Sequence, residues 1–404
     1  MNKYICVVLV LAVICVKEWK FFVPERFYAS HLGEISDFLD SHGYPLESHE
    51  VQTEDGYLLT VHRIPNGRHH VQKSTPKPPV FLMHGLLLSS VDWMILGPEK
   101  SLALILADAG YDVWIGNNRG NSRSKNHITL HPQKDRKEFF SYSYHEIGLF
   151  DLPAMIDHVL SYTGRSKLSY IGYSEGVTSF FVMGAEKPEY NEKILLMNAF
   201  APVTDSFNVT SEIFNVLSAY PWLLKLANFI GWYEMFDVST APIFRLLCQS
   251  RTLCNLLYHL LGSSKEQMPD QDTQLRILSH LPAGLSLNQI SHYIQGTITG
   301  IYGPLSQDIT TKTDHLIYDV SKVDAPIILY YGESDNLVNQ HRMLETVAKK
   351  LPNLVKLYKV PYANFNHLDF LYGNNVSLLN EEALRNLNEF NGRNSPIDKL
   401  LIRN

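Results

Sequence analysis

The segment 172–176 places a serine in a setting typical of a catalytic nucleophile. It reads Gly-Tyr-Ser-Glu-Gly, follows the strand-like run 168–171 and precedes the apolar helical run 177–183. Where a G-x-S-x-G turn joins a strand to a helix, the chain bends sharply. Side chains larger than glycine would clash at the two glycine positions, while the serine hydroxyl stays exposed. Ser174 is therefore the predicted nucleophile, and a plain tight turn is the alternative if no partner groups exist.

Two further groups are needed to activate a serine hydroxyl: a base that takes its proton and a carboxylate that orients the base. For this type of turn the chain order is serine, acid, histidine. The strand-like run 327–331 leads into Gly-Glu-Ser-Asp-Asn, which makes Asp335 the predicted acid and Glu333 its alternative, unless both are ordinary polar loop residues. Beyond that loop only two histidines remain. His341 lies in a helical stretch and is expected at the surface, whereas His367 lies on a loop after the last strand-like run and is the predicted base.

Attack by the serine on a carbonyl carbon creates an oxyanion, which needs two N–H donors. One is usually the N–H of the residue after the nucleophile, here Glu175, and the other comes from a loop after an early strand. The apolar run 80–83 leads into His84-Gly85-Leu86-Leu87, so the N–H of Leu86 is the predicted second donor. A simple turn at His84-Gly85 is the alternative, and it weakens because all four parts occur in the required order.

The composition predicts a folded chain that can position these groups. Of its 404 residues 45% are hydrophobic and 19% are charged, which is typical of a globular protein. Short β-branched or aromatic runs alternate with helical stretches, so we expect an α/β fold with a mostly parallel sheet and helices on both faces. Alternating residues on both sides of Asp55-Gly56 predict an antiparallel hairpin at the start.

The strand and helix alternation stops between residues 201 and 319, where leucines and aromatic residues recur at helical spacing. We predict an inserted helical cap or lid at 201–319, a core at 76–200 and 320–404, and an N-terminal segment with the hairpin at 16–75. The apolar stretch 216–236 contains Pro221, Lys225 and Asn228, which disfavours a transmembrane helix. Most of its aromatic residues are expected to pack against the sheet, and some to line an apolar cavity.

The N-terminus has the pattern of a secretory signal peptide, which we place at residues 1–15. Lys3 is followed by an apolar run from residue 5 to residue 16. A signal-anchor helix is the alternative, although this run is shorter than the ~20 residues that cross a bilayer. The formal net charge of −6 provides no basic excess for phosphates, so nucleic acid is not an expected partner.

If the chain is exported, two of its cysteines could form a disulfide and two of its sequons could be glycosylated. Of the four cysteines, Cys248 and Cys254 lie outside the signal segment and could form a disulfide in an oxidising compartment. Two free buried thiols are an equal alternative, because side chains six residues apart on one continuous helix could not bridge. Asn208 and Asn375 each begin an Asn-x-Ser/Thr sequon and are predicted glycosylation sites.

With these residues in place, the chain resembles the acid lipases of the gastric and lysosomal lipase family within the α/β-hydrolases. The resemblance covers nearly the whole mature chain. By this resemblance the catalytic triad falls on Ser174, Asp335 and His367, and the oxyanion donors fall on Leu86 and Glu175. The segments that carry it are HGYP at 42–45, TEDGY at 53–57, HGLL at 84–87, LADAGYDVW at 106–114, GN at 116–117, RGN at 119–121 and NHLDF at 366–370.

The resemblance implies a serine lipase that hydrolyses esters of neutral lipids at a lipid–water interface, beneath a helical cap with a mobile lid. Triacylglycerol is the implied substrate, with cholesteryl ester in some members, and no metal or organic cofactor is implied. Secretion is the expected localisation, with the lysosomal lumen as the alternative. A carboxylesterase for small soluble esters and a non-catalytic lipid-binding protein are the competing hypotheses.

This chain departs from the family pattern at two positions beside the nucleophile. The family usually carries histidine and glutamine there, whereas this chain carries Tyr173 and Glu175. The backbone N–H of Glu175 can still serve as an oxyanion donor. An ionised Glu175 side chain would, however, oppose the negative charge that develops on the oxyanion, and would change the activity or its pH dependence.

Overall fold

The computed structural model describes residues 31–68, 76–204, 209–237, 240–311 and 317–393. The predicted signal peptide at 1–15 and the predicted glycosylation site Asn208 lie outside these residues. Within the described ranges no helix is both long enough and apolar enough to cross a membrane.

A nine-stranded sheet forms the centre of the fold, and its main path runs β1-β2-β4-β3-β6-β7-β10-β11, with β5 paired to β2. The pairs β1–β2, β2–β4 and β2–β5 are antiparallel, and the remaining pairs are parallel. The predicted hairpin closes at Gly56, whose φ of +98° suits glycine. The strands are β1 (Glu47–Gln52), β2 (Tyr57–Ile64), β3 (Pro79–Met83), β4 (Asp112–Ile115), β5 (Asn126–His127), β6 (Leu168–Tyr173), β7 (Ile194–Phe200), β10 (Ile327–Tyr331) and β11 (Leu354–Lys359).

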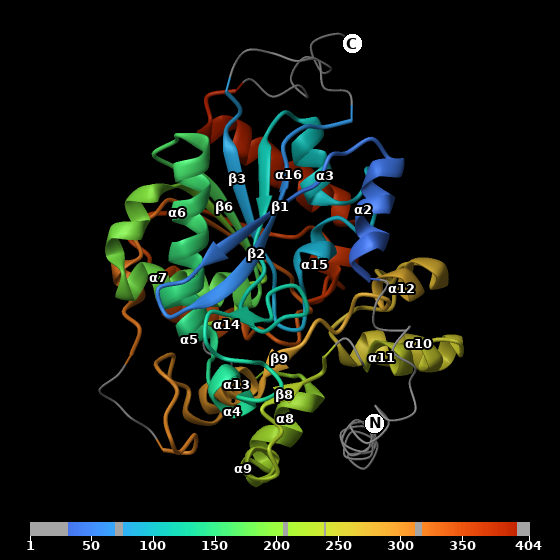
Figure 1. Ribbon diagram of the computed structural model, residues 1–404, viewed down its shortest axis with the longest axis vertical. Helices are drawn as coiled ribbons and strands as arrows, with labels where there is room; N and C mark the ends of the chain where they lie inside the picture. The colour runs from blue at the N-terminus through green and yellow to red at the C-terminus, as the bar shows by residue number, and fades with distance from the viewer. Residues whose placement is uncertain (1–30, 69–75, 205–208, 238–239, 312–316, 394–404) are drawn as a thin grey trace.

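Helices cover both faces of the sheet, as Figure 1 shows. On one face α6 and α7 pack through one buried apolar cluster, and on the other α2, α3 and α16 pack through a second. The α/β prediction of a mostly parallel sheet with helices on both faces is confirmed. The helices of this part are α2 (His31–Ser41), α3 (Leu102–Asp108), α4 (Arg136–Phe139), α5 (Tyr144–Glu146), α6 (Leu152–Thr163), α7 (Glu175–Glu186), α14 (Gln340–Met343), α15 (Asp369–Tyr372) and α16 (Val376–Phe390), with a π-helical turn before α6 at Ile147–Asp151 and another after α14 at Leu344–Ala348.

Between β7 and β10 the chain is mainly helical, and these helices gather beyond one end of the sheet (Figure 1). Two short strands, β8 (Glu234–Met235) and β9 (Leu285–Ser286), pair there in a separate small sheet. The helices are α8 (Glu212–Ala219), α9 (Trp222–Phe229), α10 (Ala241–Leu247), α11 (Arg251–Leu260), α12 (Gln271–Ile277) and α13 (Leu287–Thr299). The prediction that 201–319 forms a cap unit remains a proposal.

A disulfide joins Cys248 to Cys254 at the junction of α10 and α11. The two cysteines do not lie on one continuous helix, because α10 ends at Leu247 and α11 begins at Arg251. The intervening turn brings the side chains together, and both are buried in the core.

Candidate active site

Ser174 lies at a sharp elbow between β6 and α7. Its φ of +52° and ψ of −112° place a non-glycine residue in a sparsely populated backbone region. The glycines on either side are required by close backbone contacts. A Cβ at Gly172 would come within 2.8 Å of the carbonyl oxygen of Gly176, and a Cβ at Gly176 would collide with the carbonyl of Met83.

The predicted acid and base meet Ser174 in one hydrogen-bonded chain. His367 Nε2 lies 2.8 Å from Ser174 Oγ, and His367 Nδ1 lies 2.8 Å from Asp335 Oδ2. Because Nδ1 faces a carboxylate, it carries the proton and leaves Nε2 free to accept the serine proton. The three side chains are buried, and Ser174 retains 7% exposure.

The alternative acid, Glu333, points elsewhere. It is exposed and forms an ion pair with Lys359 on β11 at 2.8 Å. Asp335 instead accepts the N–H groups of Leu337 and Val338 at 2.9 and 3.2 Å, which fixes its carboxylate toward the histidine. The other late histidine, His341, is exposed on α14.

Asn366 connects the acid loop to the base loop. Its Oδ1 accepts the N–H of His367 at 2.7 Å and the N–H of Asn336 at 3.0 Å. Asp369 then accepts the N–H of Asn366 at 2.7 Å and the hydroxyl of Ser263 at 2.8 Å. Sequence reasoning missed these positioning groups, although both belong to the segment NHLDF at 366–370 that surrounds the histidine.

Tyr173, one of the two departures from the family pattern, also holds the histidine. Its hydroxyl donates to the carbonyl oxygen of His367 at 2.9 Å, and the two rings lie 5.2 Å apart. Burial raises the pKa of Tyr173 well above its ordinary value, so the phenol remains a donor. A tyrosine at position 173 did not by itself indicate that it positions the histidine, because the contact spans 194 residues of sequence.

The two predicted oxyanion donors flank Ser174. Gly85 packs so closely that a Cβ there would lie 3.0 Å from Ser174 Cβ, so Leu86 is the residue directly after this contact. Within the described part of the chain the N–H of Leu86 makes no hydrogen bond. The N–H of Glu175 opens α7, where helical N–H groups have no partner within the helix.

His84 orients the loop that carries Leu86. Its Nδ1 donates to the carbonyl oxygen of Gly85 at 2.8 Å, and its Nε2 accepts the backbone N–H of Asn118 at 3.3 Å. Since the carbonyl of Gly85 and the N–H of Leu86 belong to one planar peptide, this contact also sets the direction of the donor. Burial lowers the pKa of His84 to about 4, so its ring is neutral in weakly acidic solution.

The Glu175 side chain is buried beside the nucleophile, with 2% exposure. Its Oε1 accepts from Gln289 Nε2 at 2.7 Å and from Asn118 Nδ2 at 3.3 Å. Burial raises the pKa of this carboxyl group from 4.5 to about 8. The neutral form therefore prevails below that pH, and the charge that the sequence suggested would oppose the oxyanion is absent there.

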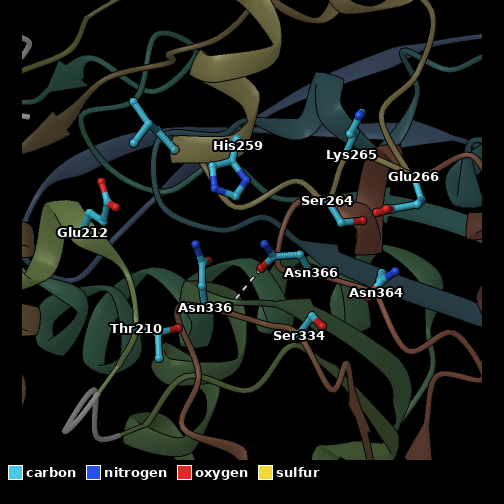
Figure 2. A pocket seen from close by; sticks show the side chains of 11 residues that line it. Thr210, Glu212, His259, Ser264, Lys265, Glu266, Ser334, Asn336, Asn364 and Asn366 are labelled. Carbon is cyan, nitrogen blue, oxygen red and sulfur yellow. Dashed lines mark hydrogen bonds between the residues drawn. The ribbon is translucent and has the colours of Figure 1, made fainter. Parts of the chain in front are cut away.

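A cavity of about 460 Å³ lies behind the acid and base loops. Asn336, which follows the acid, and Asn366, which precedes the base, line it together with His259 and Lys265, as Figure 2 shows. Ser174 does not contribute to its wall. All of the residues that line it except Leu260 carry polar or charged side chains.

The remaining predicted sites lie apart from Ser174. Asn375 is partly exposed at the start of α16, and its N–H donates to Gln267 Oε1 at 3.1 Å. Among the described residues no group of three or more His, Cys, Asp or Glu side chains could hold a metal ion.

Comparisons with known proteins agree with this architecture. A family model described as "Partial alpha/beta-hydrolase lipase region" matches residues 35–97, and one described as "alpha/beta hydrolase fold" matches residues 78–373. Lipase 1 of Drosophila melanogaster is 38% identical over 85% of this chain and 76% of its own length. Gastric triacylglycerol lipase of Homo sapiens is 33% identical over 86% of this chain and 91% of its own.

The fold also matches solved structures at low sequence identity. A carboxylesterase of Bacillus subtilis has a TM-score of 0.50 at 12% identity, and the match covers 89% of this chain and 96% of that one. This likeness concerns the fold alone, whereas the identities above extend over most of both sequences. The chain belongs to the lipase family, within the α/β-hydrolases, that includes gastric triacylglycerol lipase.

Proposed function

We propose that the protein is a serine lipase that hydrolyses carboxylic esters of neutral lipids, with Ser174 as nucleophile, His367 as base and Asp335 as the acid that orients it. The observation that carries the proposal is the buried chain from Ser174 Oγ through His367 to Asp335, with both contacts at 2.8 Å. Its geometry is that of an activated serine.

The reaction follows from the atoms in place. As Ser174 Oγ attacks the ester carbonyl carbon, its proton moves to His367 Nε2, and Asp335 stabilises the resulting imidazolium. The N–H groups of Leu86 and Glu175 stabilise the oxyanion. Collapse of the intermediate breaks the bond to the alcohol, which takes the proton from His367 and leaves an acyl-serine. Water, deprotonated by His367, then releases the fatty acid and restores the serine.

Two observations support a lipid substrate. The similar proteins are lipases, and this chain has an exposed apolar surface on α9 and the residue after it. We define this surface by Trp222, Phe229 and Ile230, which are 57%, 86% and 48% exposed. Apolar side chains so exposed favour contact with a lipid–water interface. Triacylglycerol is the first candidate substrate, and cholesteryl ester is the second.

We also propose that the protein is exported, either as a secreted enzyme or to the lysosomal lumen. The disulfide between Cys248 and Cys254 supports an oxidising compartment. The sequons at Asn208 and Asn375 are consistent with passage through it, and glycan attachment at each remains part of the proposal.

The test is fatty-acid release from emulsified long-chain triacylglycerol and cholesteryl ester, beside a soluble short-chain ester, with wild type and Ser174→Ala. We expect release from the triacylglycerol emulsion and a loss of about 10³-fold or more in the variant. Activity restricted to the soluble ester would assign a carboxylesterase. Activity on none of them, in a protein that still binds lipid, would assign a non-catalytic carrier.

A further inference from the structure

Two buried polar atoms beside the nucleophile have no hydrogen-bond partner among the described residues: Glu175 Oε2 and Asn118 Oδ1. Their side chains are already joined through their other atoms, because Asn118 Nδ2 donates to Glu175 Oε1 at 3.3 Å. The two residues are 2% and 5% exposed. Leaving a buried acceptor without a donor is costly, so two such atoms on one bonded pair require a physical explanation.

The neighbouring helix α13 shows which carboxyl oxygen can hold a proton. Gln289 Nε2 donates to Glu175 Oε1 at 2.7 Å, while Gln289 Oε1 accepts the N–H of Ser286 at 2.8 Å. The second contact fixes the orientation of the Gln289 amide, so its NH₂ group must face the carboxyl. Oε1 thus receives two N–H donors, and a proton on Glu175 belongs on Oε2.

We propose that Glu175 is protonated in the active enzyme, that its Oε2–H donates to Oδ1 of Asn118, and that loss of this proton suppresses hydrolysis. One proton gives both unpartnered atoms a partner and closes a cyclic acid–amide pair. The side chain of Glu175 is then a positioning group that connects the first turn of α7 to α13. This inference rests on the proposed function, since it concerns the same oxyanion.

The carboxylate of Asp151 also favours a neutral Glu175. Burial is the main cause that raises its pKa to about 8, the side-chain contacts with Gln289 and Tyr293 lower it in part, and the charge of Asp151 raises it. Asp151 is itself bound by Arg119, whose Nε lies 2.7 Å from its Oδ1, and Arg119 also binds Asp55 at 2.6 Å. The guanidinium is therefore engaged by two other carboxylates rather than by Glu175.

The other titratable side chains facing Glu175 are neutral in the relevant pH range. Tyr142, Tyr144 on α5 and Tyr293 on α13 are buried, and burial raises the pKa of each well above its ordinary value. His84, which contacts Asn118 from the loop after β3, has its pKa lowered to about 4. No cation therefore accompanies an ionised Glu175 from these elements.

Ionisation of Glu175 would affect the reaction in two ways. The carboxylate would lie on the residue whose N–H stabilises the oxyanion, and like charges repel strongly in a buried site. It would also remove the donor to Asn118 Oδ1 and open the cyclic pair. Glutamine at this position can accept through Oε1 and donate through Nε2 without a titrating proton, which makes Glu175→Gln the informative variant.

The experiment measures kcat for the soluble short-chain ester from pH 5 to 9.5 with wild type, Glu175→Gln and Glu186→Gln. Glu186 is exposed at the end of the same helix and provides a matched control. We expect wild type and the control to lose activity with a midpoint near 8, which is about a tenfold loss by pH 9. In Glu175→Gln we expect less than a twofold change between pH 7 and 9.

A readout independent of turnover is the infrared band of a protonated carboxyl group in wild type minus Glu175→Gln. We expect it at pH 6 and its disappearance by pH 9.5. Its absence at pH 6, a wild-type profile without the alkaline loss, or the same loss in the variant would each overturn the proposal. If Ser174→Ala remains as active as wild type, the proposed function fails, while the infrared measurement still decides the protonation of Glu175.

Discussion

Replacing Glu175 with glutamine should remove a large pH dependence of folding stability. The folded carboxyl group has a pKa near 8, compared with an ordinary value of 4.5, because burial disfavours its charged form. Between these values the folded state holds a proton that the unfolded state has released. Stability is therefore lost as the pH rises from about 4.5 to about 8 in wild type, and this contribution is absent in Glu175→Gln.

The size of the expected change follows from the two pKa values and from the opposing effect of the helix N-terminus. The difference 8 − 4.5 corresponds to about 5 kcal/mol at ~1.36 kcal/mol per pKa unit, of which ~4 kcal/mol falls between pH 5 and 8.5. The N-terminus of α7 favours the ionised form by up to ~2 kcal/mol. The burial penalty is larger, so wild type still loses stability as the pH rises. The expected net loss of unfolding free energy between pH 5 and 8.5 is roughly 2–4 kcal/mol.

The assay is urea unfolding of wild type, Glu175→Gln and Glu186→Gln at pH 5 and pH 8.5 with the disulfide intact. The quantity of interest is the change in unfolding free energy between the two pH values, compared across the three proteins. Burial also raises the pKa values of Asp92, Asp151 and Asp369 to about 6. These groups titrate in all three proteins, so their contribution cancels in the comparison.

The reasoning would be refuted by equal pH dependences, within 0.5 kcal/mol, in Glu175→Gln and wild type. That result would mean that Glu175 is ionised when folded, or that water reaches it freely. A variant whose stability falls more steeply with pH than that of wild type would also refute it, because the sign would be reversed. Glu186→Gln should follow wild type, since its side chain is exposed.

Three further changes test other contacts. Tyr173→Phe removes the donor to the His367 carbonyl, and we expect a loss of about 1 kcal/mol in urea unfolding together with a lower kcat at constant KM. Cys254→Ser opens the short loop closed with Cys248 and should lower the unfolding free energy by roughly 2 kcal/mol. Phe229→Ser removes a side chain that is 86% exposed, and emulsion hydrolysis relative to soluble-ester hydrolysis should fall about tenfold.

Sequence patterns predicted the sheet and the order of the central residues because both depend on local signals. The run at 327–331 coincides with β10 (Ile327–Tyr331), and the elbow at Ser174 follows directly from its two flanking glycines. The choice between Asp335 and Glu333 could be stated but not decided from sequence. Both lie on one loop, and only the folded chain shows which carboxylate faces the histidine and which faces solvent.

The groups that position these residues were not predictable, because their contacts join distant parts of the chain. The hydroxyl of Tyr173 reaches the carbonyl of a residue 194 positions away, and Gln289 reaches Glu175 across 114 positions. The protonation state of the Glu175 side chain was not predictable for the same reason. Sequence identifies an acid beside the nucleophile, whereas its charge depends on burial and on the amides that surround it.

The contacts around the base also tie part of the mainly helical chain between β7 and β10 to the loop that carries His367. The N–H of Leu368 donates to the carbonyl of Gly262 at 2.8 Å, and the hydroxyl of Ser263 donates to Asp369 at 2.8 Å. The segment 262–264 is thus bound to the loop that carries His367, and its displacement would disturb the base. The start of α8 is bound to the acid loop as well, because the N–H groups of Thr210 and Ser211 donate to the carbonyl oxygen of Asn336 at 3.1 and 2.9 Å. A displacement of α8 would therefore disturb the loop that carries Asp335.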